Sequence, residues 1–247
     1  MSPVAIVRWI VKQPFVAVTD IVAWLANYHF PPSFTWRTRL NHVVERYEPD
    51  TTQFFKKTIT TGMTVVDVGA NLGYFTRLAA SLVGPTGSVY AFEPDEENFL
   101  LLKKNTEHLT NVHIIQSAVS DVDGAVTFYL SHKMGMHSLL KSKDIGRQVT
   151  VPSTTLDRLY EKTDIHFVKI DVEGAEESVF HGMKKLLSRK PIVVFEYNPW
   201  DSKALVDELE KSHAIFKILH SGTLERTTTE TSRLDGKEGT NLVLKDS

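Results

Sequence analysis

The chain has 247 residues, which is enough for one α/β domain of ordinary size with extensions. Hydrophobic residues make up 42% and charged residues 23%, the composition of a globular protein. A formal net charge of −2 disfavours nucleic acid as the main partner. Because the chain has no cysteine, disulfides, thiolate zinc sites and cysteine nucleophiles are excluded.

The chain begins with an apolar arm at residues 4–30, rich in Val, Ile, Trp and Phe. Its apolar run, 15–26, is shorter than the roughly 20 residues of a spanning helix, and Asp20 interrupts it. We expect a helical arm that packs on the domain or on a second subunit. An interfacial membrane helix, favoured by Trp9 and Trp24, is the second alternative, and a cleaved leader or a spanning helix ranks last. The expected location is cytoplasmic, with peripheral membrane contact as an alternative.

From residue 62 onward, apolar strand patterns alternate with helical patterns, which predicts a doubly wound, mostly parallel sheet. One strand is predicted at 112–120, and a strand that ends at Asp171 is followed by one helix carrying Val179, Met183, Leu186 and Leu187. Two apolar segments near the C-terminus predict an antiparallel pair that closes the sheet. Residues 131–147 show no period, and loops of this length are usually functional or disordered.

The most informative stretch is Thr64–Thr76, TVVDVGANLGYFT. Its β-branched residues suit a strand buried on both faces. Gly69 and Gly73 stand where the backbone must turn sharply and approach a ligand. Asp67 lies near the end of the strand, where open α/β sheets bind their ligands. The stretch therefore predicts a ligand-binding turn between a strand and a helix.

The charge of this turn indicates the kind of ligand. The dinucleotide fingerprint is G-x-G-x-x-G, whereas this chain has D-x-G-x-x-x-G, with Ala70 and Asn71 in place of a middle glycine. A carboxylate from Asp67 would repel pyrophosphate and attract an ammonium group. S-adenosylmethionine, a nucleoside that carries an amino acid, fits that field better.

A second acidic residue follows the next apolar strand, in SVYAFEPD at Ser88–Asp95. Glu93 lies 20 positions after Gly73, the offset of the acid that holds ribose hydroxyls. Nicotinamide enzymes use the same device, so Glu93 by itself does not choose between cofactors. An acid at a strand end can also be a cap or plain surface, but the combination of Asp67 and Glu93 on consecutive strands favours S-adenosylmethionine.

These segments resemble the FkbM family of S-adenosylmethionine-dependent methyltransferases. The resemblance covers residues 62–200 and is carried by VVDVGANLGYFT, VYAFEPD, SAVSD, TLDRLY and FVKIDVEGAEESVFHGM. It implies a seven-stranded Rossmann-like methyltransferase sheet whose last strand is antiparallel. We expect a class I methyltransferase domain at 62–247, preceded by a helical N-terminal extension at 1–61 to which the resemblance does not extend. The implied reaction is methyl transfer, most often to oxygen of sugars, lipids or polyketides.

The resemblance also implies roles for individual residues. Glu93 would hold the ribose, while Ser117 and Ala118 would contact the adenine edge. Asp171 and Glu173 would lie beside the acceptor pocket. The methionine half of the cofactor would be lined by Asp67, Gly69, Ala70, Asn71, Gly73 and Tyr74.

Methyl transfer from a sulfonium is a direct displacement, in which a general base assists a hydroxyl acceptor. The candidate bases are Asp171, Glu173 and His137, with the acidic pair favoured. Glu176 and Glu177 lie further along the next helix and are expected to face solvent. Mg²⁺ held by Asp171, Glu196 and Asn198 is an alternative. Carboxylates that act without a metal are favoured over it.

Three classes of function compete at this stage. The first is an O-methyltransferase that acts on a small molecule, a sugar or a lipid-linked glycan. The second is a nicotinamide-dependent oxidoreductase, against which Asp67 and the missing middle glycine argue. The third is a non-catalytic module that keeps the fold. A homo-oligomer is compatible with each of them.

Overall fold

A computed structural model describes residues 15–131, 145–197, 203–228 and 240–245. In these ranges eight strands form one sheet in the order β10-β9-β11-β8-β7-β1-β2-β3, and β4-β6-β5 form a second sheet. The strands are β1 (Thr64–Val68), β2 (Ser88–Phe92), β3 (Val112–Ile115), β4 (Ala118–Val119), β5 (Gly124–Ser131), β6 (Ile145–Thr154), β7 (Phe167–Ile170), β8 (Ile192–Tyr197), β9 (Ala214–Leu219), β10 (Thr223–Thr227) and β11 (Thr240–Lys245).

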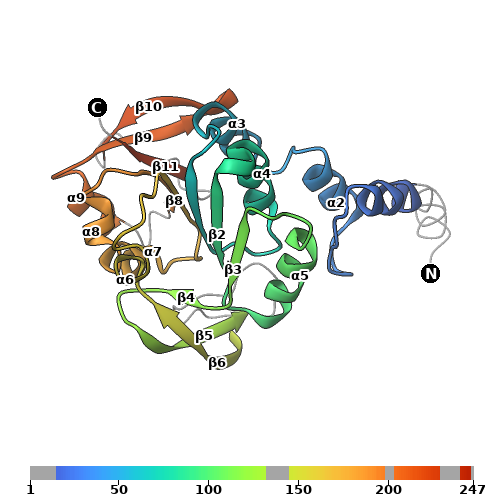
Figure 1. Ribbon diagram of the computed structural model, residues 1–247, viewed down its shortest axis with the longest axis horizontal. Helices are drawn as coiled ribbons and strands as arrows, with labels where there is room; N and C mark the ends of the chain where they lie inside the picture. Colours follow the sequence, from blue (N-terminus) through green and yellow to red (C-terminus); the bar gives the residue numbers. More distant parts are fainter. Residues whose placement is uncertain (1–14, 132–144, 198–202, 229–239, 246–247) are drawn as a thin grey trace.

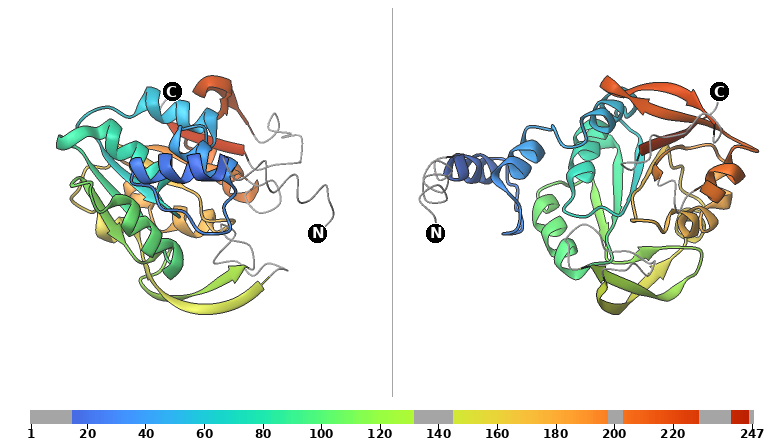
Figure 2. Two further views of the ribbon diagram at one scale, coloured as in Figure 1. Left: turned by 90° about the vertical axis from the view of Figure 1, so that its right-hand side faces the viewer. Right: turned by 180° about the vertical axis from the view of Figure 1, so that it is seen from behind.

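Helices cover both faces of the large sheet (Figures 1 and 2). Residues 15–25 are also helical. The other helices are α2 (Trp36–Val43), α3 (Pro49–Thr58), α4 (Tyr74–Val83), α5 (Glu96–Thr106), α6 (Leu156–Leu159), α7 (Glu176–His181), α8 (Lys184–Leu187) and α9 (Lys203–Leu209), with 3-10 turns η1 (Gly84–Thr86) and η2 (His220–Gly222).

The large sheet confirms the predicted doubly wound class. Strands β3, β2, β1, β7 and β8 pair in parallel, and β11 is antiparallel to both β8 and β9. These seven strands are the expected set, and the β9–β11 pair is the predicted closing pair. An eighth strand, β10, was not predicted. It pairs antiparallel with β9 and forms the edge of the sheet.

The predicted strand at 112–120 is wrong as one element, because the chain leaves the large sheet partway along it. The first part, β3, pairs with β2, whereas β4 pairs with β6 in the small sheet. Ser117 lies at the change of direction, and its hydroxyl donates to the carbonyl oxygens of Ala118 and Pro152 at 2.9 Å and 3.1 Å. A side chain thus supplies hydrogen bonds at the point where the ladder changes.

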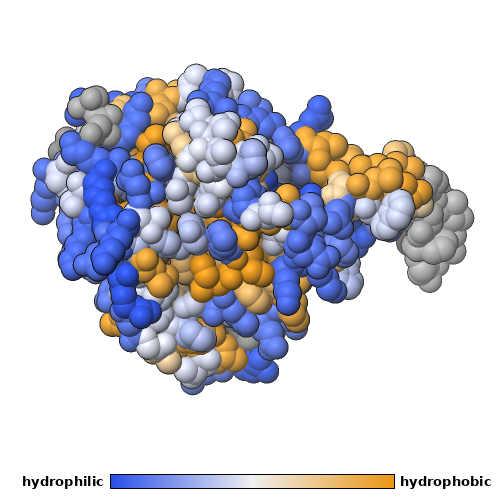
Figure 3. All heavy atoms as spheres, in the orientation of Figure 1, coloured by the Kyte–Doolittle hydropathy of each residue, from blue (hydrophilic) through white to orange (hydrophobic). Residues whose placement is uncertain are grey.

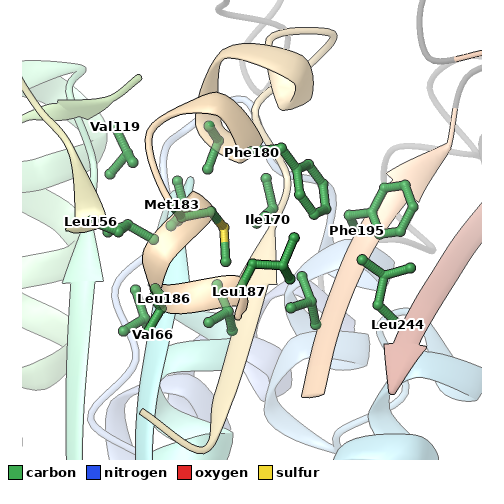
Figure 4. Packing of buried hydrophobic residues seen from close by; sticks show 14 of the residues in the cluster. Val66, Val119, Leu156, Ile170, Phe180, Met183, Leu186, Leu187, Phe195 and Leu244 are labelled. Carbon is green, nitrogen blue, oxygen red and sulfur yellow. The ribbon is translucent and has the colours of Figure 1, made fainter. Parts of the chain in front are cut away.

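Alternation along the strands builds two cores. Val65, Phe167 and Val194 face α3 and α4 on one side of the sheet. The neighbouring positions, such as Val66 and Ile170, face α6 to α9 on the other side, where Figure 4 shows them packed against the α7–α8 region. Asp67 therefore belongs to the α3–α4 side, two positions after Val65, and so does Lys169, two positions after Phe167.

The single helix predicted to follow the strand that ends at Asp171 is divided into α7 and α8 at Gly182. A Cβ atom at Gly182 would lie 1.9 Å from the carbonyl oxygen of Ser120, so the backbone of this turn packs directly on the β4 loop. The apolar stripe continues across the break, because Val179 and Met183 are both fully buried. The sequence pattern therefore located the core face correctly and missed the interruption.

The N-terminal extension is helical, as predicted, but it has two parts. Helix α3 packs on the sheet and buries Phe54 and Phe55, which are 4% and 1% exposed. The helix at 15–25 and α2 project from the body of the molecule (Figures 1 and 2). Among the described residues, none of the helices combines the length and apolar character needed to cross a membrane.

Candidate active site

A cavity of about 260 Å³ opens at the carboxyl ends of β1, β2, β3 and β7, where parallel sheets place their ligands. Each of these strands contributes the residues that follow it. Further walls come from α5, from β5 and from the N-terminal extension. The lining residues are Phe34, Tyr47, Val68, Gly69, Asn71, Phe92, Glu93, Pro94, Asn98, Ser117, Ala118, Val119, Phe128, Asp171, Val172 and Glu173.

The loop after β1 is held by its neighbours on both sides. The backbone N–H groups of Gly69 and Ala70 donate to the carbonyl oxygen of Phe92 at 3.0 Å and 2.9 Å. Gly69 has φ +77, and a Cβ atom there would lie 1.8 Å from the carbonyl oxygen of Asp171. Only glycine fits this position, because the loop after β1 touches the loop after β7 through the backbone.

Glu93 forms the floor of the cavity at the end of β2. It is 5% exposed, and its two carboxylate oxygens accept hydrogen bonds from the N–H groups of Asn71 at 2.8 Å and Asp95 at 3.0 Å. Burial raises the pKa of Glu93 to about 7, although these hydrogen bonds oppose the shift. A carboxylate offers about four lone-pair sites, so Glu93 keeps acceptor capacity for a diol beside these hydrogen bonds.

The same end of the cavity contains three more polar or small residues. Asn98, on α5, is 3% exposed, and its Oδ1 has no hydrogen-bond partner among the described residues. A buried amide oxygen without a partner on the wall of a cavity is an acceptor that a ligand can satisfy. Ser117 and Ala118, beyond β3, line the adjoining wall as predicted, whereas Asn98 was not anticipated.

Four predicted cofactor residues do not line the cavity: Asp67, Ala70, Gly73 and Tyr74. The buried Tyr74 hydroxyl lies 2.8 Å from Thr52 Oγ1, on the α3 side. Gly73 has φ +90, a backbone conformation that favours glycine, and a Cβ atom there would lie 2.7 Å from Leu102 Cδ1, so the turn geometry explains this glycine without a ligand.

Asp67 is wholly buried and paired inside the protein. Lys169, its register partner on β7, places Nζ 3.7 Å from Asp67 Oδ1 and 3.1 Å from Asp171 Oδ2. Thr76 donates to Asp67 Oδ2 at 2.6 Å, and Nζ lies 5.1 Å above the Phe75 ring. The ammonium group that attracts Asp67 is therefore a side chain of the same protein and not the predicted group of a cofactor.

The pKa of Lys169 reflects two opposing effects. Burial alone would lower it, but the charges of Asp171 and Asp67 raise it above its usual value, so the ammonium stays charged. The sequence signal for the Asp67–Lys169 pair was a lysine within the apolar string FVKI. A charged side chain is almost never fully buried without a partner.

Three carboxyl groups gather beside this lysine at the ends of β7 and β8. Oxygen atoms of Asp171, Glu173 and Glu196 lie within 4.8 Å of one another. Burial, followed by the charge of Asp171, raises the pKa of Glu173 to about 8 and that of Glu196 to about 7. Glu173 is still reached by solvent and has φ +54, a conformation that is uncommon for residues other than glycine.

Other predicted residues have different outcomes. Glu176 was expected to face solvent, but it is 2% exposed and accepts hydrogen bonds from the N–H groups of Val172 and Gly174. These N–H groups precede α7 and have no helical partner, so a buried carboxylate satisfies them. Glu177 is exposed, as expected. His137 and Asn198 lie outside the described residues.

Comparison with known proteins identifies the family. The profile described as the methyltransferase FkbM domain matches residues 67–222, more than half of the chain. The chain belongs to the FkbM methyltransferase family. The cavity of this FkbM chain is lined partly from outside the matched range, because Phe34 and Tyr47 come from the N-terminal extension. Sequence reasoning assigned no site role to either residue.

Two curated relatives are methyltransferases. Hexuronic acid methyltransferase AglP of Haloferax volcanii is 28% identical over 160 residues, which cover 62% of this chain and 64% of the relative. The 2-O-methyltransferase NoeI of Sinorhizobium fredii is 24% identical over 153 residues, covering 54% of this chain and 63% of the relative. The chain thus spans a little under two thirds of each relative.

Solved methyltransferase structures resemble the FkbM chain more distantly. An S-adenosylmethionine-dependent O-methyltransferase from Thermotoga maritima has a TM-score of 0.48 and 13% identity, covering 81% of this chain and 66% of the other. A methyltransferase from Streptococcus mutans, in complex with S-adenosylhomocysteine, has a TM-score of 0.46 and 11% identity, covering 79% of this chain and 95% of the other.

Proposed function

We propose that this protein transfers a methyl group from S-adenosylmethionine to a hydroxyl group of a sugar, a lipid-linked glycan or a related small molecule. One observation carries the proposal. A single cavity in a chain of the FkbM family has the Glu93 carboxylate at one strand end and the Asp171–Glu173 pair at another. The first can hold a ribose diol, and the second can accept the proton of a hydroxyl group.

The cavity residues fit the cofactor at three points. Glu93 would accept from the ribose hydroxyls, and Asn98, whose Oδ1 has no hydrogen-bond partner among the described residues, would contact the adenosine together with Ser117 and Ala118. The backbone at Gly69 and Asn71 would line the methionine portion. The bound cofactor supplies a methyl group that the positive sulfur already activates.

The chain's own part of the reaction is positioning and proton transfer. A carboxylate of this chain would take the proton of the acceptor hydroxyl as that oxygen receives the methyl group, and the backbone and side chains of the cavity would hold the donor and the acceptor in line. Alignment of the reacting groups is worth about 7–11 kcal/mol, and a base adds about 10²–10⁴-fold. Glu173 suits the role of base, because a group with a pKa near 8 accepts and releases protons readily near neutral pH.

A divalent metal is not required by this arrangement. Asp171, Glu173 and Glu196 could supply oxygen ligands. The ammonium of Lys169, however, lies 3.1 Å from Asp171 Oδ2 and already balances the charge of that carboxylate. We therefore favour methyl transfer by carboxylates without Mg²⁺.

Two features support a sugar-like acceptor. The names of the two relatives specify hexuronic acid and 2-O-methylation. In this chain, Phe34 and Tyr47 add aromatic surface to a cavity that also has carboxyl groups, and a sugar has both apolar faces and hydroxyl donors. The cytoplasmic location and the oligomeric state stay predictions of the sequence.

The test has two stages. Calorimetric titration with S-adenosylmethionine should show binding, and a fluorescence titration with NADH should not. Purified protein should then transfer a labelled methyl group to D-glucuronic acid or methyl glucopyranoside, with the product site located by mass spectrometry. NADH binding without S-adenosylmethionine binding would overturn the cofactor assignment. Cofactor binding without transfer to any hydroxyl compound would support the non-catalytic alternative instead.

A further inference from the structure

The projecting helix leaves most of its apolar side chains uncovered. Figure 3 shows hydrophobic residues gathered on this arm, away from the body of the molecule. Scattered exposed apolar residues are ordinary, but a contiguous group of them marks a contact surface. The exposed fractions are 52% for Phe15, 59% for Val18, 58% for Ile21, 78% for Trp24 and 70% for Leu25.

The helix has almost no charge to oppose burial of this face. Its only ionisable residue in 15–25 is Asp20, whose carboxylate lies 2.6 Å from Arg39 Nη1. Thr19, the other polar side chain, donates its hydroxyl to the backbone oxygens of Phe15 and Val16 at 2.8 Å. The cost of bringing this surface into an apolar environment is therefore low.

The arm is attached firmly at its C-terminal end. Arg77, on α4, donates to the carbonyl oxygens of Ala26 at 2.8 Å and Asn27 at 3.0 Å. The amide of Asn105, on α5, accepts from the N–H of His29 at 2.6 Å. The apolar face therefore has a defined orientation relative to the body, as a docking surface requires.

Charge distinguishes between the candidate occupants of this face. Residues 1–46 have five Lys or Arg and two Asp or Glu, a formal charge of +3, whereas residues 47–247 have a formal charge of −5. A symmetric contact with a second copy would bring two such positive N-terminal portions together. An anionic lipid surface instead complements the positive charge, and exposed Trp24 is a residue type that favours the membrane–water interface.

We propose that residues 15–25 dock the protein on an anionic lipid surface, with Val18, Ile21 and Trp24 inserted among the lipids. Arg37 and Arg46, both exposed on or beside α2, lie on the positive portion of the chain that the lipid phosphates attract. The methyl acceptor is not part of this inference. The cavity and the arm can therefore be tested separately.

The test is flotation of the full-length protein with vesicles. It should float with vesicles of phosphatidylcholine mixed with phosphatidylserine, and added salt should reduce the bound fraction. Trp24→Glu and Ile21→Glu should each weaken vesicle binding at least about tenfold, because they place a charge in the buried face. The matched control is Leu100→Glu, at a residue that is 52% exposed on α5, and it should leave binding unchanged.

Three outcomes would overturn the inference. The first is wild-type protein that stays with the lipid-free fraction. The second is equal loss of binding in Leu100→Glu. The third is a lipid-free dimer, seen by sedimentation velocity, that Ile21→Glu dissociates, which would assign the face to a second copy. Calorimetry with S-adenosylmethionine on the same variants separates this result from the proposed function, because their cofactor affinity should not change.

Discussion

Replacing Lys169 with methionine would test the buried charge network directly. The lysine side chain is 6% exposed, and the carboxylates that it neutralises belong to Asp67, which is 2% exposed, and Asp171, which is 30% exposed. The substitution keeps the length of the side chain and removes its charge. It leaves Asp67 enclosed without a cation.

Removing one partner of a buried ion pair costs about 3–5 kcal/mol, a large share of the roughly 5–15 kcal/mol that stabilises a typical domain. The loss should depend on pH. Burial raises the folded-state pKa of Asp67, and loss of the Lys169 charge would raise it further. An acid whose pKa is raised in the folded state stabilises that state at low pH, and this stabilisation is lost as the pH rises through the folded-state pKa. The loss in free energy of unfolding caused by Lys169→Met should therefore be smallest in mild acid and largest at neutral pH.

The assay is urea denaturation followed by circular dichroism at several pH values. With a slope of about 3 kcal/mol/M, the midpoint at neutral pH should fall by roughly 1–2 M. Lys184→Met, at an exposed lysine of α8, should change stability by less than about 0.5 kcal/mol. Adding Asp67→Asn to Lys169→Met should restore part of the loss. A loss below about 1 kcal/mol, or one that does not vary with pH, would refute the reasoning.

Three further predictions concern the cavity. Glu93→Gln should weaken S-adenosylmethionine binding by about 1.5–3 kcal/mol, roughly tenfold to a hundredfold, because a charged acceptor is lost; unchanged affinity by calorimetry would reject the ribose role. Activity should rise as pH passes the pKa of Glu173, about 8, and Glu173→Gln should flatten this profile while exposed Glu177→Gln preserves it. Gly69→Ala should cost about 3 kcal/mol or more in thermal or urea unfolding. Gly124 also has a positive φ, but no atom lies within 4 Å of a Cβ added there, so Gly124→Ala should lower the free energy of unfolding by only about 1–2 kcal/mol. Equal losses in the two variants would show that contact between Gly69 and the loop after β7 is unimportant.

Much of the sheet was predictable, because its signals are local. The valine-rich strand before Gly69 and the strand before Glu93 are short apolar runs bounded by turn residues, and both are observed as β1 and β2. The offset between Gly73 and Glu93 placed the acid on the cavity floor, since consecutive parallel strands end at the same edge of a sheet.

The rest depends on contacts between distant segments. The pairing of Asp67 with Lys169 requires the β1–β7 register, which no single stretch of sequence contains. Between β3 and β4, the Ser117 hydroxyl donates to the carbonyl oxygen of Pro152, which lies 35 positions later in the chain. The burial of Glu176 follows from the backbone N–H groups that precede a short helix, a local demand that the charge pattern alone does not reveal.

The position of Phe34 and Tyr47 has a practical consequence for enzyme engineering. Both line the cavity, yet they belong neither to the large sheet nor to the glycine turn after β1. Libraries randomised at these two codons can therefore change one wall of the cavity while the residues at the strand ends, such as Glu93 and Asp171, stay unchanged. The segment that contains Phe34 and Tyr47 can have an evolutionary origin different from that of the FkbM core. Two chains with the same core and different N-terminal segments should therefore differ in the substrates that they modify.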